Sequence, residues 1–393
     1  MLNLYNKAEP VDVITVKAEL VSMKKFESIG GLEYLSMLPE KVATTANVEK
    51  YIRIVEEKSM LRILIKTANE LIELGYAETE EVETIMDNAE KKIFDVIQNR
   101  NQKGYAVLKD VLVEAFTEIE KLYNLKQHIT GIPTGFADLD YKTAGLHNSD
   151  LVLIAARPSM GKSAFALNIA TNAAINAGVP VAMFNLEMSK KQLVNRMLCS
   201  EAMVDSNKIR TGKIEEEDWV KLATALGPLS EAPIYIDDTP GISVMEIRAK
   251  SRKLKLEKNI GLVVVDYLQL IQGSSKKSNT REQEISEISR SLKILAKELD
   301  IPVIALSQLS RAAEQRADHR PMLSDLRESG AIEQDADIVM FLYRDDYYNP
   351  ESEKKNIAEL IISKHRSGST GTIELLWLGN YTKFANIDRY RDE

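Results

Sequence analysis

The stretch Leu151–Ala170, LVLIAARPSMGKSAFALNIA, carries the pattern that decides the fold of this chain. Its first residues, Leu151 to Ala155, are all apolar, which is typical of a strand buried on both faces of a sheet. Gly-Lys-Ser follows at residues 161–163, and an apolar helical segment comes next. This order of strand, loop and helix matches the phosphate-binding pattern G-x-x-x-x-G-K-[ST], except that Ala156 stands where the first glycine is usual.

The chemistry of this loop predicts nucleotide binding. Backbone N–H groups of the loop and of the following helix can face the phosphates, Lys162 can reach the β- and γ-phosphate oxygens, and Ser163 can bind Mg²⁺. A plain structural turn is the alternative, but the flanking strand and amphipathic helix favour a nucleotide site. The residues predicted to bind the nucleotide are Ala156, Arg157, Pro158, Ser159, Met160, Gly161, Lys162, Ser163 and Ala164.

Length and composition describe a globular protein without a membrane span. The chain has 393 residues, enough for two domains with sizeable cores. It has no apolar run of about 18 residues, so we expect no transmembrane helix and no membrane partner. Its N-terminus lacks the basic-then-apolar layout of a signal peptide. Its one cysteine, Cys199, excludes an intramolecular disulfide and fits a reducing cytoplasm.

The net charge of −8 argues against a surface coated in positive charge for nucleic acid. Any contact with DNA must therefore be local, through a few loops. This arrangement is compatible with a ring that concentrates its basic groups in a central channel.

The hydrophobic pattern divides the chain into three parts. Residues 1–100 are expected to form a helical domain, with a long helix over 47–75 and another over about 79–98. Residues 101–148 are expected to be a linker that contains an amphipathic helix at 107–123. The apolar face of that helix must be buried either on its own chain or on a neighbouring subunit.

Residues 149–393 are expected to form an α/β domain, because strands alternate with helices from Asp150 onward. Such alternation predicts a mostly parallel sheet, closed by a final hairpin strand. The predicted strands are Leu151–Ala155, Val179–Leu186, Ile234–Ile236, Leu262–Val265, Pro302–Leu306, Ile338–Leu342, Ala358–Ser363 and Gly371–Leu378.

Three of these strands end in polar side chains that suit nucleotide chemistry. Strand ends face the ligand crevice in open α/β sheets, so Asp266 can hold Mg²⁺ opposite Ser163. Glu187 can polarise an attacking water, although a helix-capping role before Ser189 is the alternative. Gln308 can sense the γ-phosphate, or it is ordinary strand-end polarity.

Six motifs in one order resemble a known family. They are ARPSMGKS, FNLEMS, VVVDYLQL, ALSQLSR, SDLRESGAIEQDAD and SKHRSGSTG. The series is similar to the DnaB-type replicative helicases of bacteria and their phages, in which alanine is the usual first residue of the phosphate loop. The segments ITGIPTGFADLDYKTAGLHNSDL and EKKIFDVIQ resemble the linker and the N-terminal domain of that family. The resemblance implies a RecA-like P-loop NTPase motor domain of α/β class, preceded by a small all-helical domain and a linker helix.

The resemblance also implies a function. Family members are homohexameric rings that hydrolyse ATP or another nucleoside triphosphate with Mg²⁺ and move 5′→3′ on single-stranded DNA, unwinding the duplex at the replication fork. Primase and a helicase loader are the implied protein partners. The implied location is the bacterial cytoplasm, for a bacterial or a phage protein.

The matching motifs assign roles to individual residues. Lys162 and Ser163 are implied to bind phosphate and Mg²⁺, and Glu187 is the implied catalytic base. Asp266 is implied to complete the metal site, and Gln308 to couple hydrolysis to DNA.

A second group of matched residues lies later in the chain. Lys364 and Arg366 match the pair that reaches the γ-phosphate of the neighbouring subunit, and a solvated cluster of charges is the alternative. An arginine supplied in trans stabilises the charge of the transition state. Arg196 is a candidate for stacking on the nucleotide base.

Two loops are candidates for DNA contact. Arg327, Glu328 and Gly330 match the family loop that lines the channel, where a side chain and main-chain N–H groups can bind phosphates without reading sequence. The basic segment 273–281, with Lys276, Lys277 and Arg281, is a second candidate, and a plain surface loop is equally compatible with it. Few aromatic residues accompany either loop, which favours phosphate tracking over base stacking.

The resemblance implies that the chain starts inside the N-terminal domain of the family, through a late start codon, a fragment or natural shortening, so a complete N-terminal collar is not implied. Two rival functions stay open at this point. A RecA-like ATPase of strand exchange would share Lys162 and Asp266 but not the helical domain. A non-unwinding protein that docks on a primase, loader or full-length helicase would have no need of the intact set of catalytic residues.

Overall fold

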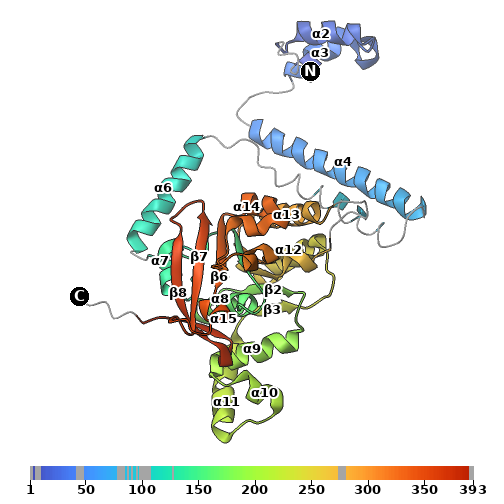
Figure 1. Ribbon diagram of the computed structural model, residues 1–393. Helices are drawn as coiled ribbons and strands as arrows, with labels where there is room; N and C mark the ends of the chain where they lie inside the picture. The colour runs from blue at the N-terminus through green and yellow to red at the C-terminus, as the bar shows by residue number, and fades with distance from the viewer. Residues whose placement is uncertain are drawn as a thin grey trace. The chain divides into compact units, whose positions relative to one another are not determined.

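The computed structural model describes residues 3–4, 10–40, 48–77, 108–125, 128–272 and 280–388, together with a few single residues between 85 and 96. The chain divides into two compact units, Met1–Glu118 and Ile119–Glu393, coloured from blue to red along the chain in Figure 1. In the described part, no helix is long and apolar enough to cross a membrane. The boundary between the units falls inside one helix, α6.

The first unit is helical, as the pattern predicts. Its elements are α2 (Val13–Ser22), the short 3₁₀ helix η1 (Glu27–Ile29), α3 (Gly31–Glu40), α4 (Val48–Ala77) and the start of α6 (Leu108–Leu125). Asp12 caps α2, because its side chain accepts hydrogen bonds from the backbone N–H groups of Ile14 and Thr15. The long helix predicted over 47–75 is confirmed as α4. Most of the helix predicted over 79–98 lies outside the described residues.

The second unit is built on one sheet of nine strands, in the order β3-β2-β4-β5-β1-β6-β7-β8-β9. The strands are β1 (Leu151–Ala156), β2 (Val181–Asn185), β3 (Ile234–Asp237), β4 (Leu262–Asp266), β5 (Val303–Gln308), β6 (Ile338–Tyr343), β7 (Ile357–His365), β8 (Gly371–Leu378) and β9 (Lys383–Asn386). Strands β1 to β6 are parallel, and β7, β8 and β9 add on antiparallel. All eight predicted strands are therefore present, and the short β9 is an addition.

Helices cover both faces of this sheet (Figure 1). The helices that follow α6 are α7 (Ala137–Thr143), α8 (Lys162–Asn176), α9 (Lys190–Ala202), α10 (Ser206–Thr211), α11 (Glu216–Glu231), α12 (Val244–Lys258), α13 (Arg281–Leu299), α14 (Gly330–Asp335) and α15 (Asp345–Tyr348). Of these, α10 and part of α11 pack with the end of α9 in a separate small cluster. Short 3₁₀ helices lie between them: η3 (Leu268–Leu270), η4 (Arg311–Gln315), η5 (Leu323–Ser329) and η6 (Gly379–Tyr381).

Strand β1 shows why the sheet needs two helical layers. Every one of its residues is buried. Val152 and Ile154 join the core that holds α8, whereas Leu151 and Leu153 join the core that holds α12 and α13. The continuous apolar run of β1 thus follows from burial of both faces of a parallel sheet.

Aromatic packing fixes α8 against the sheet. The ring of Phe165, fully buried, lies 4.9 Å from that of Phe136 and 5.4 Å from that of Phe384. These contacts hold the first turns of α8, and hence the loop before it, in place.

We expect Phe165→Ala to lower the free energy of unfolding of the second unit by about 3–5 kcal/mol, because it removes buried surface and leaves a cavity. Both tryptophans, Trp219 and Trp377, lie in this unit, so urea unfolding followed by tryptophan fluorescence reports on it. Asn176→Ala, at an exposed position at the end of the same helix, is the control and should change the midpoint little. A loss below about 1 kcal/mol for Phe165→Ala would contradict this packing argument.

Candidate active site

The phosphate loop joins the end of β1 to the start of α8, as predicted. Gly161 stands at the N-terminus of α8 with φ of +96°, a conformation that side chains rarely adopt. A Cβ atom there would also lie 2.8 Å from Cζ of Phe384. Glycine is therefore required at this position for two independent reasons.

A cavity of about 440 Å³ opens beside the loop. The sequence-predicted residues that line it are Ala156, Arg157, Pro158, Ser159, Gly161, Lys162, Ser163, Ala164, Glu187, Arg196 and Gln308. The fold thus brings together residues from β1, α8, α9 and the ends of β2 and β5. Met160 differs from its neighbours, because it is buried in the core and does not line the cavity.

Two residues of the cavity, Trp377 and Thr382, are absent from the sequence-based prediction. Both come from the antiparallel end of the sheet, β8 and the segment after it. Their sequence positions carry no motif that links them to a phosphate loop more than two hundred residues earlier. Tertiary contacts bring them to the cavity. Strand β8 pairs with β9, and β9 is bound to α8 by the hydrogen bond from the backbone N–H of Phe384 to the Asn168 side chain.

Lys162, which lines the cavity, is paired with the buried Asp266, which does not line it. Nζ of Lys162 is 3.7 Å from Oδ1 of Asp266, whose side chain is fully buried. The Asn185 amide donates to Oδ2 of Asp266 at 3.1 Å, while Oδ1 accepts no hydrogen bond. Burial lowers the pKa of Lys162, and the charges of Asp266 and Glu187 oppose that shift.

Asn185, the last residue of β2, also shapes the turn that carries Glu187. Its side-chain oxygen accepts hydrogen bonds from the backbone N–H groups of Glu187 at 3.1 Å and Met188 at 2.6 Å. One amide side chain therefore connects the Asp266 carboxylate to the backbone of the predicted base. A polar residue at the end of an apolar strand was the available signal, but the prediction singled out only the acid two residues later.

Gln308 is held at the end of β5 by a second amide. Gln269 donates to Oγ of Ser307 at 3.0 Å and to the carbonyl oxygen of Gln308 at 3.2 Å, and it accepts from the backbone N–H of Gln308 at 3.3 Å. These bonds fix the last peptide of β5 and leave the Gln308 side chain exposed toward the cavity.

The side chain of Arg157 is already engaged within the chain. Its Nε lies 2.9 Å from the Glu314 carboxylate, and its Nη1 donates to the carbonyl oxygen of Leu309 at 2.7 Å. Arg157 therefore links the phosphate loop to the segment that follows Gln308.

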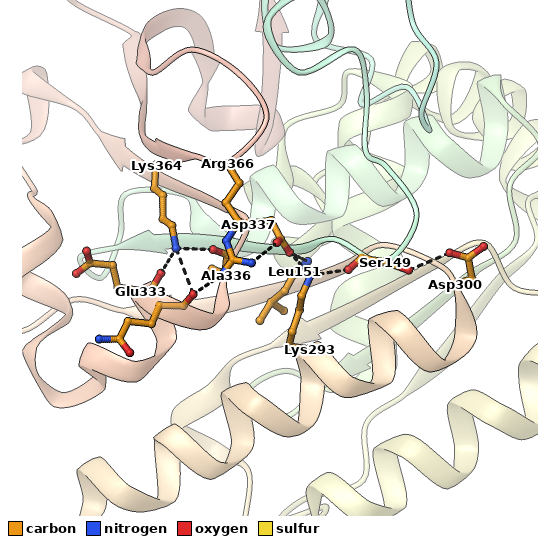
Figure 2. A network of polar contacts seen from close by, with 10 residues as sticks. Ser149, Leu151, Lys293, Asp300, Glu333, Ala336, Asp337, Lys364 and Arg366 are labelled. Atoms are coloured by element: carbon orange, nitrogen blue, oxygen red, sulfur yellow. Dashed lines mark hydrogen bonds and ion pairs between the residues drawn. The ribbon is translucent and has the colours of Figure 1, made fainter. Parts of the chain in front are cut away.

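Lys364 and Arg366 lie at the opposite end of the sheet from the phosphate loop. Strand β7 runs antiparallel to β6 with His365 opposite Ile338, and Ile338 in turn lies opposite Val152 at the start of β1. The loop follows the other end of β1, about 20 Å away at 3.3 Å per residue. The structure does not bring this pair to the cavity of its own chain. Figure 2 shows Arg366 next to Asp337, whose carboxylate is bonded to Leu151 at the beginning of β1, and Lys364 over the carbonyl oxygens of Glu333 and Ala336.

The DNA-contact candidates are only partly described. The backbone of Arg327 and Glu328 lies in η5 and Gly330 begins α14, but their side chains lie outside the description. Lys276 and Lys277 also lie outside the described residues. Arg281 begins α13, and its guanidinium pairs with Glu284 at 2.6 Å and donates to the carbonyl oxygen of Gln269. Its charge is thus engaged by Glu284 and by the backbone of Gln269, the residue whose side chain holds the last peptide of β5.

Fold and cavity together define a class of protein. A parallel sheet with a phosphate loop after β1, a buried acid at the end of β4 and an exposed acid after β2 is the arrangement of a P-loop NTPase motor. The sheet, with its helical N-terminal unit, is consistent with a RecA-like motor domain.

Comparisons with known proteins identify the family. Residues 131–386 match the family model for the DnaB-like helicase C terminal domain, and residues 1–57 match that for the DnaB-like helicase N terminal domain. The chain is 56% identical to the replicative DNA helicase DnaB of Geobacillus stearothermophilus and 55% identical to the replicative DNA helicase DnaC of Bacillus subtilis (strain 168). Both alignments cover 100% of this chain and 87% of the relative.

Solved structures agree with these matches. One, described as a DnaB-like replicative helicase and its interactions with primase, has a TM-score of 0.77 and 41% identity, covering 98% of this chain and 90% of its own. Another, described as an ATPase domain, has a TM-score of 0.69 and 47% identity, covering 72% of this chain and 100% of its own. The chain belongs to the DnaB-like family of replicative DNA helicases, and its activity is that of an ATP-dependent DNA helicase.

Replacing Asn185 should slow ATP hydrolysis without abolishing nucleotide binding. In Asn185→Ala, the Asp266 carboxylate loses its donor and the Glu187 turn loses its acceptor, so both acids shift while the phosphate loop stays intact. We expect kcat to fall about 10- to 100-fold, as is typical of a misplacement near 1 Å. Affinity for a fluorescent ATP analogue, measured by titration, should change little. Equal losses in binding and turnover would instead indicate that the whole cavity had collapsed.

Proposed function

We propose that this helicase works as a homohexameric ring that moves 5′→3′ on single-stranded DNA at the replication fork. Each subunit completes the active site of its neighbour with Arg366 and Lys364. The observation that carries the proposal is the position of these two cations, at the opposite end of the sheet from their own phosphate loop. A head-to-tail contact between identical subunits would place the two ends of the sheet together, and such heterologous contacts form a ring when the rotation between subunits closes.

Within one site, we assign roles to the phosphate loop and to three side chains of the cavity. Lys162 and the loop N–H groups bind the β- and γ-phosphates, and Glu187 accepts the proton of the attacking water. Gln308 senses the γ-phosphate, and Arg196 contacts the base. Arg366 and Lys364 of the neighbouring subunit stabilise the charge that develops on the transferred phosphoryl group.

Ser163 and Asp266 would hold Mg²⁺. The buried Oδ1 atom of Asp266, which accepts no hydrogen bond, fits this role because it is left ready for a metal-bound water. The ion would neutralise charge on the β- and γ-phosphates. ATP is the proposed fuel, and other nucleoside triphosphates would use the same loop.

DNA contact is assigned to the loop of Arg327, Glu328 and Gly330, with the basic segment around Lys276, Lys277 and Arg281 as a second contact. The first loop lies directly after the segment anchored by Asp325, whose carboxylate pairs with Arg316 at 2.5 Å and is nearly fully buried. Because the Asp325–Arg316 pair fixes one end of the loop, the loop can transmit force to a DNA strand. The net charge of −8 requires such local contacts.

Helix α6 supplies a second argument for assembly. Its apolar residues are exposed in the single chain, Phe116 at 72% among them. A surface of the same character lies on α11, where Trp219 is 60% and Val220 is 67% exposed. We propose that α6 of one subunit packs against the α11 surface of the next, which would bury both patches.

Primase and a helicase loader are the proposed protein partners, in the bacterial cytoplasm. For primase, the support is the relative whose structure was described with its primase interactions. For the loader, the support is membership of the family alone.

Arg366→Ala should abolish cooperative ATP hydrolysis while leaving nucleotide binding intact. Wild-type turnover, measured against protein concentration, should rise as rings form and should increase with single-stranded DNA. Loss of a finger supplied in trans is expected to cost about 10³- to 10⁵-fold in kcat. Lys258→Ala, an exposed cation at the end of α12, is the matched control and should behave as wild type.

Two outcomes would contradict the ring mechanism. Turnover that is independent of concentration and unaffected by Arg366→Ala would indicate a monomeric ATPase. No wild-type turnover at any concentration would favour a protein that only docks on other replication proteins.

Phe116→Ser should weaken the ring without unfolding the subunit. Its side chain is exposed, so its removal should change the free energy of unfolding by less than about 0.5 kcal/mol. Multi-angle light scattering should show the hexamer dissociating at a higher protein concentration than in wild type. Lys109→Ser, exposed on the same helix, should leave assembly unchanged. Unchanged assembly in Phe116→Ser would show that α6 lies outside the contact.

A further inference from the structure

The guanidinium of Arg366 is held on one side by its own chain. Nη1 lies 3.3 Å from Oδ1 of Asp337, and Nη2 donates to the carbonyl oxygen of Gln334 at 2.5 Å. The backbone N–H of Arg366 also donates to the carbonyl oxygen of Asp337 at 2.9 Å. Half of the side chain is nevertheless exposed. One edge of this cation is thus fixed while the rest faces outward.

Lys364 is held by the same segment. Its ammonium group donates to the carbonyl oxygens of Glu333, of Gln334 at 3.3 Å and of Ala336 at 2.8 Å (Figure 2). The first two carbonyls belong to the last turn of α14, and the third follows the helix. The last carbonyls of a helix lack partners within the helix. Both cations therefore rest on the end of α14 and on the residues that follow it.

Asp337 is the charged centre of this arrangement. Its Oδ2 atom accepts from the backbone N–H of Leu151 at 2.8 Å and pairs with Nζ of Lys293. Nζ of Lys293 also donates to the carbonyl oxygen of Ser149 at 2.7 Å. Only 10% of the Asp337 side chain is exposed. One oxygen thus anchors the carboxylate to β1 and α13, and the other faces Arg366, as Figure 2 shows.

The two oxygens of Asp337 have different partners, which indicates a role beyond charge balance. Lys293 already neutralises the carboxylate, so a second cation is not needed to bury it. A carboxylate held by two donors has a defined direction, and Arg366 is the group at which its remaining oxygen points. Rigid support of this kind is what an arginine needs if it must meet a phosphate with a precision below 1 Å.

We propose that Asp337 is a positioning residue for Arg366: it orients the guanidinium that each subunit offers to the nucleotide of its neighbour. This inference rests on the proposed function, in which Arg366 acts in trans. Asp337 itself touches no nucleotide. A competing role exists, because the bond from Leu151 ties Asp337 to β1, the strand that leads to the phosphate loop of its own chain.

Subunit mixing separates the two roles. Asp337→Asn keeps the shape and an acceptor for Leu151 but removes the charge that faces Arg366. We expect its turnover to fall about 10- to 100-fold with unchanged affinity for a fluorescent ATP analogue. Lys162→Ala subunits have no working phosphate loop but an intact Arg366. In rings reassembled from equal amounts of both variants, about one site in four combines the intact phosphate loop of an Asp337→Asn subunit with the correctly held Arg366 of a Lys162→Ala subunit. Turnover should recover to about a quarter of wild type.

The same mixture made with Arg366→Ala tests the proposed function on its own. Turnover is measured without DNA, so that translocation is not required. No recovery with Arg366→Ala would overturn the trans assignment itself. Recovery with Arg366→Ala but not with Asp337→Asn would overturn the present inference and place Asp337 with its own phosphate loop. Recovery in both mixtures is the expected result.

A second variant keeps the test valid if Asp337→Asn does not fold. If tryptophan fluorescence shows that Asp337→Asn is unfolded, Asp337→Glu keeps the charge and moves the carboxylate by one methylene. A positioning role predicts reduced turnover that recovers on mixing with Lys162→Ala. Wild-type turnover in Asp337→Glu would overturn the inference, because charge alone would then suffice.

Discussion

The rest of the structure depends on the length and burial of β1. This parallel strand is buried along its six residues and is hydrogen-bonded to β5 on one edge and β6 on the other, so it is held straight in the middle of the sheet. The phosphate loop leaves one end, and Asp337 with Arg366 is bound to the other. About 20 Å of rigid strand separates them, at 3.3 Å per residue. If both ends act on nucleotide, one subunit contributes to two different active sites, which is the physical ground for proposing a ring.

Each end of the strand is organised around a buried carboxylate. At the loop, Asp266 is held by Asn185 and lies beside Lys162. At the other end, Asp337 is held by Leu151 and Lys293. Buried charges contribute little net stability, because desolvation offsets most of the attraction. What such charges provide is direction: one oxygen of each carboxylate is bound to the scaffold, while the other faces Lys162 in the case of Asp266 and Arg366 in the case of Asp337.

Local patterns were sufficient for much of the site. The apolar runs predicted the strands, and the polar residues after them predicted Lys162, Glu187, Asp266 and Gln308, because parallel strand ends meet at one edge of a sheet. Asn185 also ends such a strand, but the pattern does not show which groups its side chain connects, and Gln269 and Trp377 carry no such signal. Their roles come from side chains that cross between strands or from the antiparallel pairing of β8 and β9, and neither leaves a period in the sequence.

By itself, the sequence determined the class of fold, the phosphate loop and the resemblance to a helicase family, because each depends on residues close together along the chain. Only the tertiary structure decided that Lys364 and Arg366 lie far from their own loop, and that Asp337 stands between Arg366 and β1. These facts depend on the order and direction of the strands. Strand order is set by the packing of distant segments, which no local pattern of residues encodes.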